Sequence, residues 1–207
     1  ILTASDALFN EVITPEGNTI LSKDGDVELV IENFIENYPE FSYKGARGTI
    51  ATTGFNGIFG YDLKTELSKQ SAKEVVDKLK KMGWSFASHS YTHNRKGFFG
   101  SGSQVSKIEY DTKKWKEEIE PIVGKTNIFC APFGYLLKGQ ALEVILNNGF
   151  DIYCTVGVKA KTSINDRYAL MSRNEISGYA LKMYKQEMNN RFFNPDEVID
   201  LYRPPLR

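Results

Sequence analysis

The sequence predicts an α/β fold in which short buried strands alternate with amphipathic helices. Apolar runs of about five residues, several of them ending at glycine or proline, recur along the chain, and apolar residues at helical spacing lie between them. This alternation is typical of parallel βαβ units, which build either a barrel or an open doubly wound sheet. No glycine-rich phosphate loop follows any predicted strand, and this disfavours a dinucleotide-binding sheet.

The first half of the chain predicts two helices and two strands. A helix precedes Pro39, which stops it, and a buried strand covers residues 48–52. A capping box at residues 71–74 predicts the start of the second helix, and Gly83 predicts its end. A second strand covers residues 84–88. The apolar stripes of the two helices are Val27, Val30, Ile31, Phe34, Ile35 and Tyr38 in the first, and Ala72, Val75, Val76, Leu79 and Met82 in the second.

The second half continues the same alternation. A helix carries apolar residues from Val105 to Ile119, and a strand over residues 127–131 ends at Pro132. A helix over residues 137–148 is followed by a strand over residues 150–156, and residues 167–173 are consistent with another strand. Near the end of the chain, Asn194 and Pro195 are typical of the start of a short helix.

Length and composition narrow the classes of protein. The 207 residues fit a single domain, residues 1–207, with a substantial core. The formal net charge is +0, from 26 basic and 26 acidic residues, so nothing indicates nucleic acid or an acidic membrane surface as a partner. No apolar run is long enough to span a membrane, and no signal peptide is visible. The chain begins at Ile1 instead of methionine, and we therefore expect a fragment or a processed form.

Both histidines of the chain lie close together, directly after a predicted strand. They are His89 and His93, within the segment Ser-His-Ser-Tyr-Thr-His at residues 88–93. Neutral imidazole is the commonest metal ligand among side chains, and two ligands four residues apart can converge on one ion. In parallel barrels the chemistry lies at the carboxyl ends of strands, where this pair is predicted. The pattern predicts a divalent metal site, with zinc as the favoured ion.

A zinc-protease interpretation does not fit this pair. That class needs a glutamate directly after the first histidine, on a helix, to act as the general base. Ser90 occupies that position, and the residues before His89 have a strand pattern. The pair is therefore assigned to another class of metallohydrolase.

The segment from Gly83 to His93 resembles the second motif of polysaccharide deacetylases, the NodB-homology group or carbohydrate esterase family four. That motif is His-Ser/Thr-x-x-His after a strand, and His89, Ser90 and His93 match it fully. Residues 41–48 and 53–57 also resemble an atypical bacterial branch of this group. The resemblance implies a distorted (β/α) barrel and a zinc-type ion held by two histidines and an aspartate. It also implies a second aspartate as base and an N- or O-acetylated polysaccharide as substrate.

The third family motif, Arg-x-Pro-Tyr/Phe, resembles residues 130–133. Pro132 and Phe133 match, but Cys130 stands where the arginine belongs. The resemblance implies that the backbone N–H of Phe133 helps to bind the oxyanion, a role that survives changes of side chain. The alternative, a strand that ends in a plain proline turn, fits the residues equally well. Cys130 and Cys154 fall near the ends of consecutive predicted strands, so either two buried free thiols, a disulfide or a soft-metal site could result.

Two other family motifs have no clear counterpart. No Asp-Asp pair occurs in the chain, so the base and the third metal ligand are expected on a first strand upstream of Ile1, with Asp6 as a weaker candidate for the ligand. On this view the domain is truncated at its N-terminus. No third histidine is present to act as general acid, and Tyr135 or Tyr179 could donate a proton instead.

These residues predict a metal-dependent hydrolase that removes acetyl groups from a polysaccharide or cell-wall glycan. By resemblance we expect a bacterial protein at the cell envelope or outside the cell. The missing motifs leave two alternatives, a catalytically weakened deacetylase-fold module that binds carbohydrate, and another metallohydrolase that acts on a small amide. The presence of a carboxylate pair on the first strand separates the enzyme from the binding module.

Overall fold

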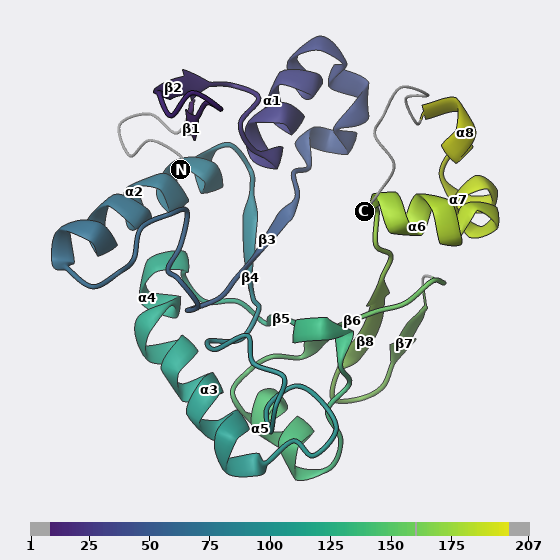
Figure 1. Cartoon of the computed structure of the whole chain (residues 1–207). Helices are drawn as coiled ribbons and strands as arrows, with labels where there is room; N and C mark the ends of the chain where they lie inside the picture. Colours follow the sequence, from purple (N-terminus) through teal and green to yellow (C-terminus); the bar gives the residue numbers. More distant parts are fainter. Residues whose placement is uncertain (1–8, 160, 199–207) are drawn as a thin grey trace.

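The computed structural model describes residues 9–159 and 161–198, and within them the chain has a mixed α/β fold (Figure 1). Its main sheet has the strand order β3-β4-β5-β6-β8-β7, in which all neighbours are parallel except β7 and β8. The α/β prediction is confirmed. A distorted barrel was predicted, and within the described residues its strands form an open sheet with β3 and β7 at the edges. The strands are β3 (Thr49–Thr52), β4 (Ser85–Ser88), β5 (Ile128–Cys130), β6 (Ile152–Val156), β7 (Thr162–Ile164) and β8 (Ala169–Arg173).

The helices of the central part of the chain form an arc along one side of this sheet (Figure 1). They are α2 (Glu66–Lys81), α3 (Val105–Glu118), α4 (Glu120–Val123) and α5 (Gln140–Asn147). Successive strand residues point to opposite faces, and one face presents large side chains to these helices. Burying such side chains is the main favourable contribution to folding. The core includes Val75, Val76, Leu79, Phe86, Ile108, Trp115, Phe129, Ile145 and Tyr153.

The opposite face of the sheet carries smaller side chains. Ala87, Cys130 and Cys154 form a separate buried cluster there, on three neighbouring strands. Cys130 and Cys154 are register partners on the parallel strands β5 and β6. Both thiols are free and buried, as the first of the three alternatives proposed for them requires.

An N-terminal unit lies at the β3 end of the sheet (Figure 1). Arg47 connects this unit to the sheet, because its Nε and Nη2 atoms donate to the two carboxylate oxygens of Glu32 at 2.7 and 2.9 Å. Trp84 Nε1 donates to the same carboxylate at 2.7 Å. The unit consists of the antiparallel hairpin β1 (Asn10–Ile13) and β2 (Thr19–Ser22), the helix α1 (Val27–Asn37) and two short turns of 3₁₀ helix, Pro39–Phe41 and Tyr43–Gly45.

Three short helices follow β8. They are α6 (Gly178–Met183), α7 (Lys185–Arg191) and α8 (Pro195–Val198). Asn194 precedes α8, and its side chain accepts a hydrogen bond from the N–H of Asp196 at 3.2 Å, which confirms the predicted helix start. In the described part of the chain, no helix is long and apolar enough to cross a membrane.

Several predicted boundaries change in the structure. The predicted start of α2 at the capping box is wrong, because Thr65 caps the helix by accepting from Ser68 N at 3.1 Å, and Ser71 therefore lies inside it. The helix predicted from residue 137 begins only at Gln140, because Gly139 has a φ of +55° and a ψ of −138°, outside the helical region. The hairpin, β7, α6 and α7 were not predicted.

Candidate functional site

His89 directly follows β4 and extends its pairing with β3. The backbone N–H of His89 donates to the carbonyl oxygen of Thr52 at 2.8 Å. On the other side, Nδ1 of the ring lies 2.6 Å from the carbonyl oxygen of Cys130, at the end of β5. A carbonyl oxygen can only accept, so Nδ1 carries the proton and Nε2 keeps its lone pair. The fold thus orients this imidazole with Nε2 available as a ligand atom.

The surroundings of His89 favour its neutral form. Burial is the main cause that lowers the pKa of His89, and electrostatic interactions with His93 and Arg173 act in the same direction. The hydrogen bond to the Cys130 carbonyl opposes this shift. Because only a neutral imidazole can donate its lone pair, these effects together keep His89 in the state that binds metal ions.

His93 is brought back toward His89 by a tight turn. Ser90 and His93 have positive φ angles of 65° and 46°, which are uncommon for residues with a side chain. Ser90 Oγ accepts from the N–H of His93 at 3.0 Å and closes the turn. As a result, the two imidazole rings lie with their centroids 4.9 Å apart and their planes at 58°. The structure therefore places the two predicted ligands side by side.

Asp111 on α3 holds this turn and was not predicted as part of the site. Its side chain is fully buried, and its two oxygens accept from Tyr91 N and Thr92 N, each at 2.8 Å, and from Thr92 Oγ1 at 2.7 Å. Burial raises the pKa of Asp111, and the three donors oppose this rise. A signal was present in the sequence, because Asp111 lies within the apolar stripe that runs from Ile108 to Trp115.

Phe133 lies in the turn that follows β5. Its φ is +56°, the residue is 47% exposed, and its ring centroid lies 4.7 Å from that of His93. The N–H groups of the next two residues donate to carbonyls within the turn, whereas the N–H of Phe133 has no hydrogen-bond partner among the described residues. A free backbone donor therefore stands next to the histidine pair. Its predicted role toward an oxyanion stays a prediction.

Comparison with known proteins assigns the family. A model of the polysaccharide deacetylase family matches residues 31–152, more than half of the chain. The chain belongs to the polysaccharide deacetylase family. A solved structure from Mycobacterium smegmatis, assigned to the polysaccharide deacetylases, shares 15% sequence identity and a TM-score of 0.44. The match covers 72% of this chain and 46% of that one, so this chain spans less than half of its length. No curated protein matches the chain.

The donor set of this deacetylase domain fits a metal ion in part. His89 and His93 supply two imidazole rings, and the hydrogen bond from His89 to a backbone carbonyl is the usual outer support of a metal-binding histidine. Within residues 9–159 and 161–198, no group of three or more His, Cys, Asp or Glu side chains is placed to hold a metal. Asp6, the weaker candidate for the third ligand, lies outside the described residues.

The two tyrosines considered as proton donors do not contact the histidine pair in this deacetylase domain. Tyr135 is half-buried, and its backbone carbonyl accepts from the hydroxyl of Tyr153 at 2.8 Å. Tyr179 is 56% exposed on α6 and lies against the ring of Tyr184. Neither ring forms a hydrogen bond or a ring contact with His89 or His93, and a general acid role for them stays a prediction.

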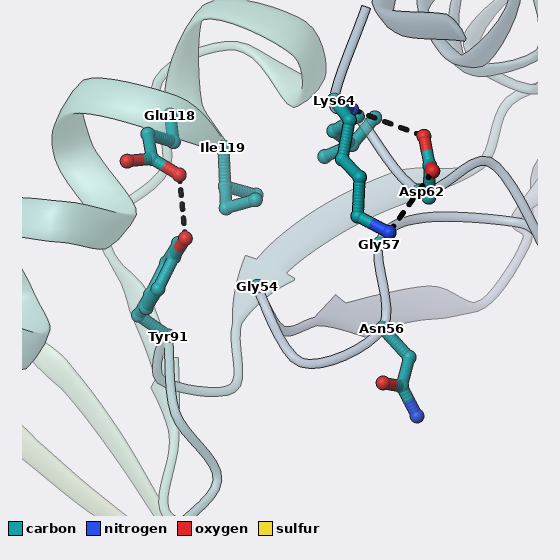
Figure 2. A pocket seen from close by; sticks show the side chains of 9 residues that line it. Gly54, Asn56, Gly57, Asp62, Lys64, Tyr91, Glu118 and Ile119 are labelled. Carbon is teal, nitrogen blue, oxygen red and sulfur yellow. Dashed lines mark hydrogen bonds and ion pairs between the residues drawn. The ribbon is translucent and has the colours of Figure 1, made fainter.

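A cavity of about 510 Å³ adjoins the histidine turn (Figure 2). Tyr91, which lies between the two histidines in sequence, points into it, and its hydroxyl donates to the carboxylate of Glu118 at 2.5 Å. This bond is the main cause that raises the pKa of Tyr91 to about 12. Asp62 and Lys64 form an ion pair on the facing wall. In the deacetylase domain this polar hollow lies next to the turn and is not formed by the histidines themselves.

Proposed function

We propose that this protein is a metal-dependent hydrolase that removes N- or O-linked acetyl groups from a polysaccharide or cell-wall glycan. Family membership supports the deacetylase role and a polysaccharide as substrate. The observation that carries the metal dependence is the pair of imidazole rings, 4.9 Å apart, one of which has its Nδ1 proton fixed on a backbone carbonyl. The proposed location, extracellular or at the cell envelope, follows from the proposed substrate.

His89 and His93 would hold the ion, and two imidazoles favour zinc among the divalent metals. When bound, such an ion supplies Lewis-acid activation of water and of the acetyl carbonyl. The N–H of Phe133 is free to donate to the carbonyl oxygen as negative charge develops there. The exposed ring of Phe133, packed on His93, would shield that oxygen from bulk water.

The carboxylates that complete such a site are not among the described residues. A set of two imidazoles and one carboxylate leaves a position open for water, and a second carboxylate would take a proton from that water. We propose that both come from outside the described residues, with Asp6 as one candidate for the ligand. If the chain lacks them, the protein would be a carbohydrate-binding module that retains a weak metal site.

Metal binding is tested on the purified chain by zinc titration and metal analysis. We expect about one ion per chain, and a His89→Ala, His93→Ala double variant should bind zinc at least about 100-fold more weakly. Lys96→Ala, an exposed substitution close to the same turn, is the matched control and should bind as the wild type does. Unchanged zinc binding in the double variant would refute the ligand assignment.

Activity is tested by acetate release from chito-oligosaccharides, peptidoglycan and acetylxylan. Release should require added metal and stop when a chelator is present. No release from any of the three, together with measurable binding to one of them, would favour the binding module over the enzyme.

A further inference from the structure

Arg173 ends β8, and its side chain reaches across the carboxyl ends of β6 and β5. Nε donates to the carbonyl oxygen of Thr155 at 3.3 Å, and Nη2 donates to the carbonyl oxygen of Ala131 at 3.2 Å. The carbonyl of the preceding residue, Cys130, is the group that binds His89 Nδ1. The guanidinium and the imidazole therefore bind consecutive carbonyl groups of one strand end.

The charge of Arg173 has no acidic partner in the part of the chain that the structure describes. The side chain is half-buried, and a guanidinium stays protonated in proteins. Of its five N–H groups, the two bonds above use one on Nε and one on Nη2, so three remain. The other arginines described contact carboxylates or an aromatic ring: Arg47 with Glu32, Arg167 with Glu143, Arg191 with Glu187, and Arg95 with the ring of Phe133.

A second guanidinium lies near this strand end. Phe133 lies on the turn that follows Ala131, and the guanidinium of Arg95 lies 5.4 Å from the centroid of its ring. The buried carboxylate nearest to the histidine turn, Asp111, is already saturated by three donors of Tyr91 and Thr92. Arg95 therefore adds positive charge beside Phe133, and the oxygens of Asp111 are directed at the turn.

We propose that Arg173 is an anion-binding residue that takes a carboxylate at the carboxyl end of β5, beside His89. The free N–H groups are the two on Nη1 and the second one on Nη2, and this edge of the guanidinium matches the two oxygens of a carboxylate. The carboxylate comes either from a small molecule, such as acetate or an acidic sugar, or from the chain itself. The site needs no metal, so it goes beyond the proposed function.

The test follows the Nε–Hε signal of Arg173 by ¹H–¹⁵N NMR in the metal-free chain. Sodium acetate, titrated at constant ionic strength, should shift this signal and the amides of residues 131–134 in a saturable way, whereas neutral acetamide should not. Arg173→Met should weaken acetate binding at least about tenfold, as expected when a charged hydrogen bond is lost. Arg167→Met is the control. It removes an exposed arginine that lies just before the start of β8, and it should leave the response of the amides to acetate unchanged.

A carboxylate of the chain itself gives a different result. The Arg173 signal would then ignore acetate but shift as the pH falls through about 5 to 3, where carboxyl groups protonate. Arg167, which pairs with Glu143, is the reference for such a response.

If methionine at 173 prevents folding, Arg173→Lys, which keeps the charge but loses the forked guanidinium group, should still bind acetate more weakly. Equal acetate binding in the folded variants, or a wild-type signal that responds to neither acetate nor pH, would overturn the proposal. Zinc binding is measured separately, so failure here leaves the histidine assignment intact.

Discussion

Replacing Asp111 by asparagine tests whether one buried carboxylate holds the histidine turn. Asparagine has nearly the same size but carries one acceptor oxygen and an NH₂ donor. In its best orientation the amide oxygen takes the place of Oδ2 and keeps both bonds from Thr92. The NH₂ group then faces the N–H of Tyr91, so one donor points at another where Oδ1 now accepts. The substitution therefore removes one charge-assisted bond and leaves a donor without a partner.

The size of this effect follows from the bonds of Asp111. A hydrogen bond to a charged group contributes roughly 1.5–3 kcal/mol, and a buried donor without a partner costs about 1–3 kcal/mol. Burial of the Asp111 charge is unfavourable and raises the pKa of this carboxyl group. The Asn variant avoids this cost, which offsets part of the loss. We expect the free energy of unfolding to fall by roughly 2–4 kcal/mol. For a chain of this size, each kcal/mol changes Tm by about 2–4 °C, so Tm should fall by roughly 4–16 °C.

Urea and thermal unfolding, followed by circular dichroism, measure this change. Asp166→Asn is the matched control, because Asp166 is exposed in a loop, and its unfolding free energy should stay within about 0.5 kcal/mol of the wild type. If Asp111→Asn also stays within about 0.5 kcal/mol, the three bonds of Asp111 do not hold the turn.

Two further substitutions test the framework of the site by the same unfolding measurements. Glu32→Gln should lower the free energy of unfolding by roughly 1–3 kcal/mol, because the paired bonds from Arg47 and the bond from Trp84 lose their charged acceptor; an unchanged midpoint would contradict this. Gly54→Ala should destabilise the protein by roughly 1–3 kcal/mol, because its Cβ would lie 2.2 Å from the ring of Tyr91. The second prediction fails if alanine at position 54 leaves both the free energy of unfolding and the environment of Tyr91 unchanged.

The order of the elements and the place of the histidine pair could be predicted from the amino-acid sequence. Strand and helix periodicity are local patterns, so β4, α3 and β8 lie where the sequence predicted them. His89 and His93 are four residues apart and follow a strand, so their approach depends mainly on one short turn. The start of α2 was predicted wrongly because Thr65 and Ser71 both have the side chain of an N-cap residue, and the local pattern does not choose between them.

The groups that support the histidine pair depend on long-range packing. Asp111 reaches the turn from 19 residues away, and Arg173 binds Ala131 across a separation of 42 residues. Such contacts depend on which face of a helix or strand packs against its neighbour, and a buried aspartate in an apolar stripe gives only a weak local signal of it. The proton on Nδ1 of His89 is likewise fixed by a carbonyl of the next strand, 41 residues along the chain. The sequence therefore indicated the two candidate ligands, whereas packing between strands and helices set their orientation, the protonated nitrogen of His89 and the position of the guanidinium beside them.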